Sequence, residues 1–201
     1  KTAVDAGLKT YSTSSYPPSD PLGKSISYHT YGRSILINPE RTNFVRDQTH
    51  KANQTFWYYA TGSYSGQIGN LVKNRYLSGF LFFLSGADGM MSWTFQRPHG
   101  DPFDDFYANK TGQLCITYPN PNRKDGNLDT PQWEGLRQGW IDFQYISTLA
   151  EIAKKTTTAQ KELNRIINTM PFNGDVFRDG VTNEMCDKWR EEIAIAIERF
   201  S

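Results

Sequence analysis

The sequence predicts an α/β fold that corresponds to the C-terminal half of a TIM-like (β/α)8 barrel, followed by additional C-terminal helices. Strand-like and helix-like segments alternate up to about residue 95, a rhythm typical of parallel strands joined by right-handed crossovers. Four such units make half of an eight-stranded barrel. The alternative is a doubly wound open sheet. No glycine-rich phosphate loop follows any of the strands, which argues against a nucleotide-binding version of that alternative.

Four segments have the composition of strands. Residues 9–14 (KTYSTS) precede a proline-rich loop, and residues 25–31 (SISYHTY) are bounded by Gly32. Residues 56–60 are almost wholly aromatic, and residues 90–95 (MMSWTF) form the fourth predicted strand. Aromatic residues suit the packed surface of a sheet, so these segments are expected to pair with one another.

Two helices are expected between these strands. Asn38 is a good N-cap, Pro39 fits the first turn and Glu40 meets the positive end of the helix dipole, so a helix should run from here to about residue 52. Residues 68–85 are polar at first and then fully apolar, which predicts one helix with a buried end.

The second part of the chain is predicted to be mainly helical. A short strand at residues 114–118 lies outside the barrel rhythm, and Thr130-Pro131 then opens a long helix. Further helices are expected at residues 159–170 and from about Thr182. The apolar stripes of the first and last of these helices are Leu136, Trp140, Phe143, Ile146 and Leu149, and Met185, Trp189, Ile193 and Ile197. We therefore expect a barrel half over residues 1–155 and a helical extension over residues 156–201 that packs on it.

Composition excludes several classes of function. The formal net charge is +1 with no basic stripe, so nucleic acid is not an expected partner, and no apolar run reaches the roughly 18 residues that span a bilayer. Cys115 and Cys186 have no zinc or redox spacing, and the sequence does not decide between buried thiols and one disulfide. No cofactor is expected. The sequence does not fix the compartment, and our expectation is a secreted or cell-surface protein.

In a parallel barrel the active site forms at the carboxyl ends of the strands. Those ends offer mostly aromatic side chains here: Tyr11, Tyr16, Tyr28, His29, Tyr31, Trp57, Tyr58, Tyr59, Tyr64, Trp93 and Gln96. None of them is a carboxylate, the side chain that serves most often as a general acid apart from histidine. Asp88 is the acidic residue nearest to a strand, and it precedes that strand. This part of the chain therefore predicts a binding platform without its own catalytic acid.

Strand alternation divides the best candidates into two sets. Trp57 and Tyr59 share one face of their strand, whereas Tyr58 points to the other, and periodicity does not show which face is inside the barrel. Trp93 lies on the fourth strand.

Three polar constellations have simpler interpretations. His29, His50 and His99 lack metal-ligand spacing, and Asp101, Asp104 and Asp105 lack the alternation of a calcium loop, so no metal site is expected. Glu134, Arg137 and Asp142 lie on one helix, where a surface ion-pair cluster is the favoured interpretation over a role in ligand binding.

The order of several short motifs resembles the C-terminal part of glycoside hydrolase family 123-like proteins over roughly residues 7–155. The motifs are Trp57-Tyr58-Tyr59, Asn70 to Arg75 ahead of the apolar helix, Gly89 to Trp93, Tyr118-Pro119, and Trp133-Glu134, Leu136-Arg137, Gly139, Asp142 and Tyr145. The resemblance implies an eight-stranded barrel and cleavage of β-linked N-acetylgalactosamine, in which the acetamido oxygen of the substrate attacks the anomeric carbon.

The resemblance also implies which residues carry the chemistry. The Asp-Glu pair of the family lies before the position that matches Lys1, so no catalytic residue transfers to this sequence. Trp57, Tyr59 and Trp93 would line the sugar site, with Tyr58 as a further candidate.

The resulting hypothesis is a portion of a glycoside hydrolase for a β-linked N-acetylhexosamine, inactive by itself. Its expected partners are the carbohydrate substrate and the missing N-terminal half of the barrel, on the same chain or on a companion fragment. The rival hypothesis is a non-catalytic carbohydrate-binding or structural barrel module.

Overall fold

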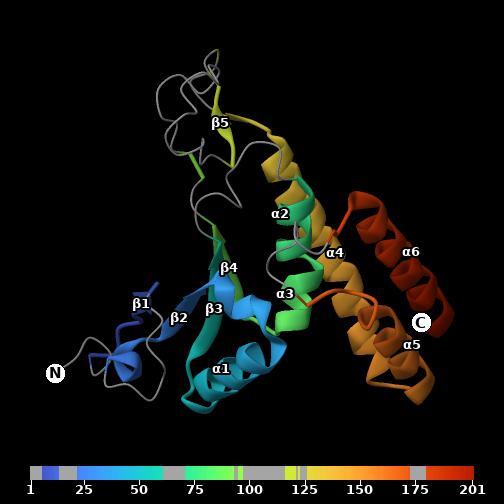
Figure 1. The fold of residues 1–201 in the computed structure, drawn as a ribbon, viewed down its shortest axis with the longest axis horizontal. Helices are drawn as coiled ribbons and strands as arrows, with labels where there is room; N and C mark the ends of the chain where they lie inside the picture. Colours follow the sequence, from blue (N-terminus) through green and yellow to red (C-terminus); the bar gives the residue numbers. More distant parts are fainter. Residues whose placement is uncertain are drawn as a thin grey trace.

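The computed structural model describes residues 6–13, 22–60, 71–92, 95–96, 116–120, 122, 126–172 and 180–201. Its centre is a parallel sheet in which four strands are neighbours in chain order: β1 (Tyr11–Ser12), β2 (Tyr28–Gly32), β3 (Thr55–Ala60) and β4 (Gly89–Ser92) (Figure 1). A doubly wound sheet reverses its strand order at a switch point, and the described sheet shows no such reversal.

Helices and a small hairpin complete the described chain. The 3-10 segments are η1 (Gly23–Ser25) and η2 (Arg33–Ile37), and the hairpin joins β5 (Tyr118–Pro119) to β6 (Asn127–Leu128). The helices are α1 (Pro39–Lys51), α2 (Leu71–Ser78), α3 (Phe80–Ser85), α4 (Pro131–Ala153), α5 (Thr157–Ile167) and α6 (Asn183–Phe200). The predicted α/β class with a parallel sheet is confirmed. The described strands form an open sheet and not a closed barrel.

Helices α1, α2 and α3 pack against the same face of the sheet. Phe56 and Tyr58 of β3 point into this layer and are fully buried. The Tyr58 hydroxyl donates a hydrogen bond to the carbonyl of Leu77 in α2, and its ring lies 6.1 Å from that of Phe82 in α3. Tyr31 of β2 is also buried in this layer, where its ring lies 5.5 Å from that of Phe56. The core therefore begins between the sheet and these helices, and it continues into α4, α5 and α6, where Ile146, Leu163 and Trp189 are also buried.

The start of the chain forms less strand than predicted. Of the strand expected at residues 9–14, only the two residues of β1 are observed as strand. In the segment at residues 25–31, η1 and a bend occupy the first part, so β2 begins at Tyr28. The Thr10 carbonyl accepts hydrogen bonds from the amides of both Ser27 and Tyr28, which fixes the point where pairing begins. The helix predicted from Asn38 is confirmed as α1, because the Asn38 side chain accepts from the Arg41 amide at 2.9 Å.

The prediction of one continuous helix over residues 68–85 is wrong within the described residues. The chain breaks between α2 and α3 at Gly79, whose φ and ψ are −110° and −101°. A β-carbon on Gly79 would lie 2.8 Å from the Gly139 carbonyl oxygen of α4. The break therefore occurs where α4 crosses at a distance that only glycine tolerates.

The buried face of α4 is rotated from the predicted stripe. Ile146 and Leu149 are buried as expected, but the N-terminal half buries Gly135, Gly139 and Asp142, while Trp140 is 55% exposed. A β-carbon on Gly135 would lie 2.3 Å from the Leu71 carbonyl oxygen, and one on Gly139 would lie 2.0 Å from Ser78 Oγ. The prediction missed this face because two glycines and a carboxylate add nothing to an apolar pattern.

Asp142 is the centre of a buried ion-pair cluster that joins three helices. Its Oδ2 accepts from Arg75 Nε of α2 at 2.7 Å and its Oδ1 from Arg190 Nε of α6 at 2.5 Å, and Arg75 Nη1 also pairs with Asp187 at 2.7 Å. Burial acts to lower the pKa of Arg75, but its bonds to Asp142 and Asp187 outweigh this effect and leave that pKa raised. Asp142 therefore does not belong to a surface cluster with Glu134, as the sequence had suggested.

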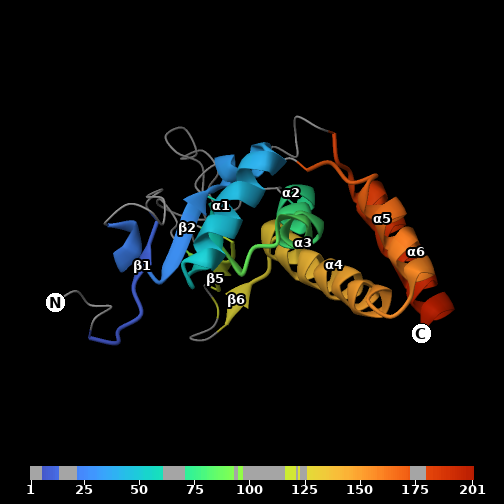
Figure 2. The same cartoon turned by 90° about the horizontal axis from the view of Figure 1, so that it is seen from below.

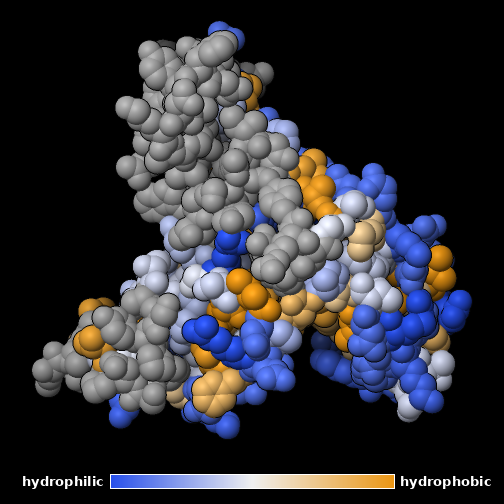
Figure 3. Space-filling model, in the orientation of Figure 1, coloured by the Kyte–Doolittle hydropathy of each residue, from blue (hydrophilic) through white to orange (hydrophobic). Residues whose placement is uncertain are grey.

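Helices α5 and α6 pack against α4 and against each other (Figure 2). The predicted stripe of α6 holds for Trp189 and Ile193, which are buried, and Trp189 packs against Phe80 at a ring distance of 5.5 Å. Cys186 of α6 is a free, buried thiol, and burial raises its pKa to about 12. Cys115 lies outside the described residues. Figure 3 shows a largely hydrophilic surface on α5 and α6 and hydrophobic side chains where the sheet meets the helices.

Among the described residues, none of the helices combines the length and the apolar character that crossing a bilayer requires.

Substituting Asp142 by Asn should lower the free energy of unfolding by about 3–5 kcal/mol, because two arginines would lose a carboxylate that is wholly buried. Glu134→Gln is the matched control, since Glu134 pairs with Arg137 on the surface and such pairs contribute at most about 1 kcal/mol. Chemical denaturation of the intact protein measures both. Equal losses in the two variants would contradict a structural role for the buried cluster.

Burial raises the pKa of Tyr58 and of Tyr31, so the folded protein holds these protons to a higher pH than the unfolded chain does. Stability should therefore be intact below the ordinary tyrosine pKa of about 10 and fall as the pH rises above it. The Tyr58→Phe variant should lose about 1 kcal/mol at pH 7, from its bond to Leu77, but fall less steeply in alkali. Denaturation midpoints measured from pH 7 to 11 test this, and parallel pH profiles would refute it.

Candidate functional site

The face of the sheet opposite the helices is the candidate site, and we call it the open face. Residues that pair directly across parallel strands point to the same side, so the register defines the members of this face. They are Tyr11, Tyr28, Thr30, Gly32, Thr55, Trp57, Tyr59, Gly89 and Met91. From the sequence, alternation along β3 did not show which of its faces the helices cover. The structure decides this: Trp57 and Tyr59 lie on the open face, and Tyr58 lies on the face that the helices cover.

Trp57 is held over the neighbouring strand. Its register partner is Gly89, and a β-carbon at that position would lie 2.4 Å from Trp57 Cε2 and 2.5 Å from Cδ2. The indole therefore rests on the bare backbone of β4, where any other residue would displace it. On the opposite side, the ring of Tyr28 meets the indole edge-on at 5.7 Å and 71°. Trp57 remains partly exposed between these two contacts, which makes it a fixed aromatic platform.

Tyr59 lies two residues closer to the carboxyl end of β3. Its partner on β2 is Gly32, so no side chain covers it from that strand, and the ring is partly exposed. Desolvation, and to a lesser degree Tyr11, raises the pKa of Tyr59. The phenol is therefore neutral at physiological pH and available as a hydrogen-bond donor or acceptor.

The remaining two candidates are placed differently. Tyr58 offers no surface to a ligand, because its side chain is fully buried and its hydroxyl is bonded to Leu77. Trp93 lies outside the described residues, as do Tyr16 and Tyr64. Of the four aromatic residues predicted to contact substrate, Trp57 and Tyr59 are therefore brought together on the open face.

No carboxylate belongs to the open face in the part of the chain that the structure describes. Asp88 lies at the amino end of β4, as predicted, where its Oδ2 accepts from the Phe56 amide at 2.8 Å and lies 2.8 Å from His50 Nε2. This acid therefore holds β3, β4 and α1 together. His29 is buried with Nε2 3.1 Å from the Gly23 carbonyl oxygen, and the described residues contain no cluster able to hold a metal.

Glu134 and Arg137 form the surface pair that the sequence suggested. Arg137 Nη2 lies 2.6 Å from Glu134 Oε1, and hydrogen bonds from Arg137 and Gln138 lower the pKa of Glu134 to about 2. A carboxylate that stays ionised in this way is a poor proton donor, so Glu134 is not a candidate general acid.

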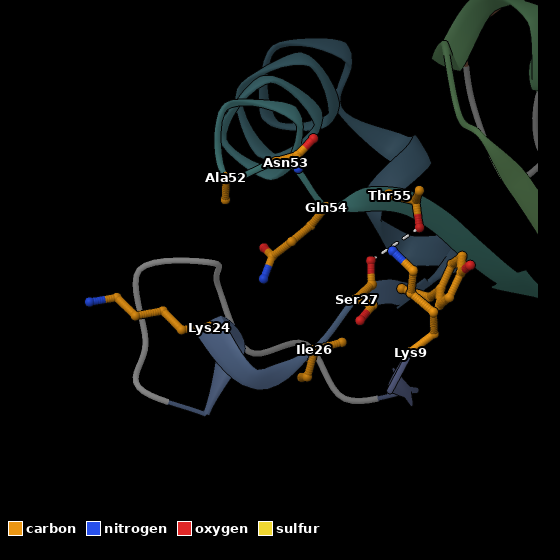
Figure 4. A pocket seen from close by; sticks show the side chains of 9 residues that line it. Lys9, Lys24, Ile26, Ser27, Ala52, Asn53, Gln54 and Thr55 are labelled. Carbon is orange, nitrogen blue, oxygen red and sulfur yellow. Dashed lines mark hydrogen bonds between the residues drawn. The ribbon is translucent and has the colours of Figure 1, made fainter. Parts of the chain in front are cut away.

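A hollow of about 300 Å³ lies at the other end of the sheet (Figure 4). Its lining includes Lys9, Lys24, Ser27, Asn53 and Gln54, without a carboxylate. These residues precede the strands or occupy their first positions, whereas parallel sheets place catalytic groups at the carboxyl ends. The hollow is therefore not the candidate active site.

Beyond the carboxyl end of β4, a second aromatic pair was missed in the sequence. Phe95 and Trp133 are 50% and 37% exposed, and their rings meet at 6.4 Å and 82°. Gln96, predicted as a strand-end candidate, donates from Nε2 to Asn127 Oδ1 at 2.6 Å and so braces the β5–β6 hairpin. Gly89, on which the Trp57 indole rests, also belongs to the site but was missed in the sequence. The available signal was the glycine itself, because a glycine within a strand often marks a place where another group approaches the backbone closely.

Comparison with known proteins supports the resemblance. The sequence model described as "Glycoside hydrolase 123, catalytic domain" matches residues 23–149. No curated protein matches the chain. Among solved structures, a family 123 glycoside hydrolase from Clostridium perfringens, studied for glycolipid glycan hydrolysis, is similar with a TM-score of 0.59 and 13% sequence identity.

The similarity to the clostridial structure covers 90% of this chain and 34% of that one, so the chain spans about a third of the length of that hydrolase. At this level of identity, the likeness shows a shared fold. The family match extends over more than half of the chain and includes the whole of β2, β3 and β4, with both Trp57 and Gly89. This chain therefore belongs to the glycoside hydrolase 123 catalytic-domain family.

Proposed function

We propose that this chain is the C-terminal half of a (β/α)8 barrel in a glycoside hydrolase that acts on a β-linked N-acetylhexosamine, with N-acetylgalactosamine as the expected sugar. The observation that carries the proposal is the indole of Trp57, seated on Gly89 at an aromatic face that the described helices leave uncovered. The unreversed order of the parallel strands supports the barrel half. In this proposal residues 1–155 belong to the barrel and residues 156–201 form the helical extension.

Sugar binding follows from the chemistry of the open face. The C–H groups on one side of a pyranose ring form an apolar surface that an aromatic face covers well, and a fixed ring loses little conformational entropy on binding. Trp57 would supply this surface, and Tyr59 would hydrogen-bond a sugar hydroxyl or the acetamido group. Trp93 is included from the family resemblance. Tyr58 is not included, because it is buried in the core.

The proposed reaction is substrate-assisted hydrolysis with retention of configuration. The acetamido oxygen attacks the anomeric carbon, the glycosidic C–O bond breaks, and an acid delivers its proton to the departing oxygen. The conjugate base of that acid then takes a proton from water, and the water oxygen attacks the anomeric carbon from the face that the leaving group vacated, which breaks the bond to the acetamido oxygen and restores the original configuration. The acid and the group that orients the acetamide would come from residues preceding this segment, which would explain why the described open face carries aromatic rings without a carboxylate. The segment alone would then be inactive.

The alternative is a non-catalytic carbohydrate-binding or structural barrel module. The observation in its favour is the same absence of a carboxylate on the described open face. A protein that binds N-acetylgalactosaminides but does not cleave them would support this alternative.

The first test is Trp57→Ala in the native protein that contains this chain, assayed with an aryl β-N-acetylgalactosaminide. Loss of the ring stack should remove roughly 1.4 kcal/mol of transition-state binding, so kcat/KM should fall about tenfold. Phe44→Ala is the matched control, since Phe44 is a 65% exposed aromatic residue on α1 and should leave kcat/KM unchanged. Parent-like activity in the Trp57 variant, or equal losses in both variants, would contradict the proposed platform.

The mechanism is tested separately with a substrate whose acetamido group is replaced by trifluoroacetamido. Fluorine withdraws electrons from the carbonyl oxygen that is the proposed nucleophile, so kcat should fall by at least about a hundredfold if that oxygen attacks in the rate-limiting step. The aryl leaving group stays constant between the two substrates. A nearly unchanged kcat would instead favour a nucleophile supplied by the enzyme.

A further inference from the structure

A second aromatic surface lies beyond the carboxyl end of β4. It consists of Phe95 and Trp133, which we call the rim pair and which are 50% and 37% exposed. The two rings stand nearly perpendicular, at 82° and a centroid distance of 6.4 Å. Figure 1 shows the β5–β6 hairpin and the first turn of α4 at this end of the sheet. The rim pair therefore presents apolar ring faces at the end of the sheet where a parallel barrel binds its substrate.

A buried segment holds both rings in place. The Phe95 carbonyl accepts hydrogen bonds from the amides of Ile116 and Thr117, each at 3.1 Å. The Ile116 carbonyl accepts the hydroxyl of Thr130, and Thr130 Oγ1 in turn accepts from the Trp133 amide at 3.1 Å. Ile116, Thr117 and Thr130 are all buried. The two exposed rings are therefore mounted on a fixed backbone, which reduces the entropy that is lost when a ligand binds.

Amide side chains lie next to the rim pair. Gln96 follows Phe95 in the chain, and its Nε2 donates to Thr117 Oγ1 at 3.2 Å and to Asn127 Oδ1 at 2.6 Å. Asn127 is exposed, and since Gln96 occupies its Oδ1, its amide nitrogen is the group that it offers to a ligand. Apolar ring faces bordered by neutral amides match the C–H faces and the hydroxyl groups of a sugar.

The size and the charge of this surface favour a sugar over other ligands. An aromatic side chain buries about 150–250 Å², so at these exposures the rim pair offers an area on the order of 200 Å². A stable protein partner needs about 800 Å² on each side. Glu134, which follows Trp133, pairs with Arg137 at 2.6 Å, so these two charges of α4 are already matched. An uncharged ring of the size of a sugar fits both observations.

We infer that the rim pair is a second sugar-binding subsite, which stacks a sugar of the leaving group while Trp57 and Tyr59 hold the N-acetylhexosamine. This inference rests on the proposed function for the sugar at the open face. Met91 is the register partner of Tyr59, and Phe95 follows it by four residues, so the chain between them spans at most about 14 Å. A glycan of a few residues covers this distance. The rim pair therefore selects sugar chains over glycosides with a small leaving group.

The main test compares two substrates in the native protein that contains this chain. One is an aryl β-N-acetylgalactosaminide, and the other is a trisaccharide in which the same sugar is linked to lactose. Phe95→Ala should lower kcat/KM for the trisaccharide about fivefold to tenfold and leave kcat/KM for the aryl glycoside unchanged, because only the trisaccharide reaches the ring. Phe44→Ala, which removes another exposed phenylalanine, should change neither value. Equal losses on both substrates in the Phe95 variant, or no loss on either, would overturn the inference.

The second ring provides an independent measurement. Trp133→Ala should show the same selective loss on the trisaccharide, whereas Trp133→Tyr, which keeps an aromatic face, should retain most of the parent activity. Parent-like hydrolysis of the trisaccharide by Trp133→Ala would contradict the proposed stacking.

Binding of lactose alone separates this inference from the proposed function. Saturation-transfer NMR should detect lactose on the intact protein, and Phe95→Ala should weaken its Kd about fivefold. If the protein binds lactose in this way but cleaves no N-acetylgalactosaminide, the proposed function fails and the sugar site of the rim pair stands. If it cleaves both substrates and neither variant changes their ratio, the rim pair has no role in the leaving-group site and the proposed function stands.

Discussion

The arrangement of the helices depends on the buried pair of Arg75 and Asp142. Two charges taken out of water destabilise a fold unless each is fully paired, and here the carboxylate is shared by guanidinium groups from α2 and α6. Such a cluster tolerates little displacement, so it fixes α2, α4 and α6 relative to one another. Gly135 and Gly139 make the cluster possible, because they let α4 approach the backbone of α2 closely enough for the short Asp142 side chain to reach Arg75.

The same helix pair positions the open face, although it does not touch it. The Leu77 carbonyl of α2 accepts the hydroxyl of Tyr58, which fixes the helix side of β3. Alternation along β3 then directs Trp57 and Tyr59 to the other side, where Gly89 gives the indole its seat. A change in the packing of α2 against α4 would therefore reach the candidate sugar platform through Tyr58, one residue away from each of the two aromatic side chains.

The features predicted from the sequence are those that local chemistry decides. The helix starts at Asn38, Thr130 and Thr182 are predictable because each cap side chain accepts a hydrogen bond within its own first turn. The break at Gly79 and the rotated face of α4 cannot be predicted from local sequence, because both arise from contact between helices about 60 residues apart in the chain. Likewise, alternation separates Tyr58 from Trp57 and Tyr59, but the choice of open face requires knowledge of which side the helices cover. Glu134 and Asp142 looked alike on one helix, yet only Asp142 meets arginines from other helices.

The carboxylates of Asp142 and Asp88 and the aromatic rings of the open face lie on different parts of the fold. Among the described residues, the buried carboxylate of Asp142 joins helices, and the exposed carboxylate of Asp88 closes the amino end of the sheet. The open face carries neutral aromatic rings instead. A hydrolase needs both a surface that holds the sugar and an acid whose pKa is set by its surroundings, and nothing requires one segment to supply both. Under the proposed function, this half would supply the rigid aromatic wall and the other half the acid, and the acid's pKa would then be set by groups outside the described open face.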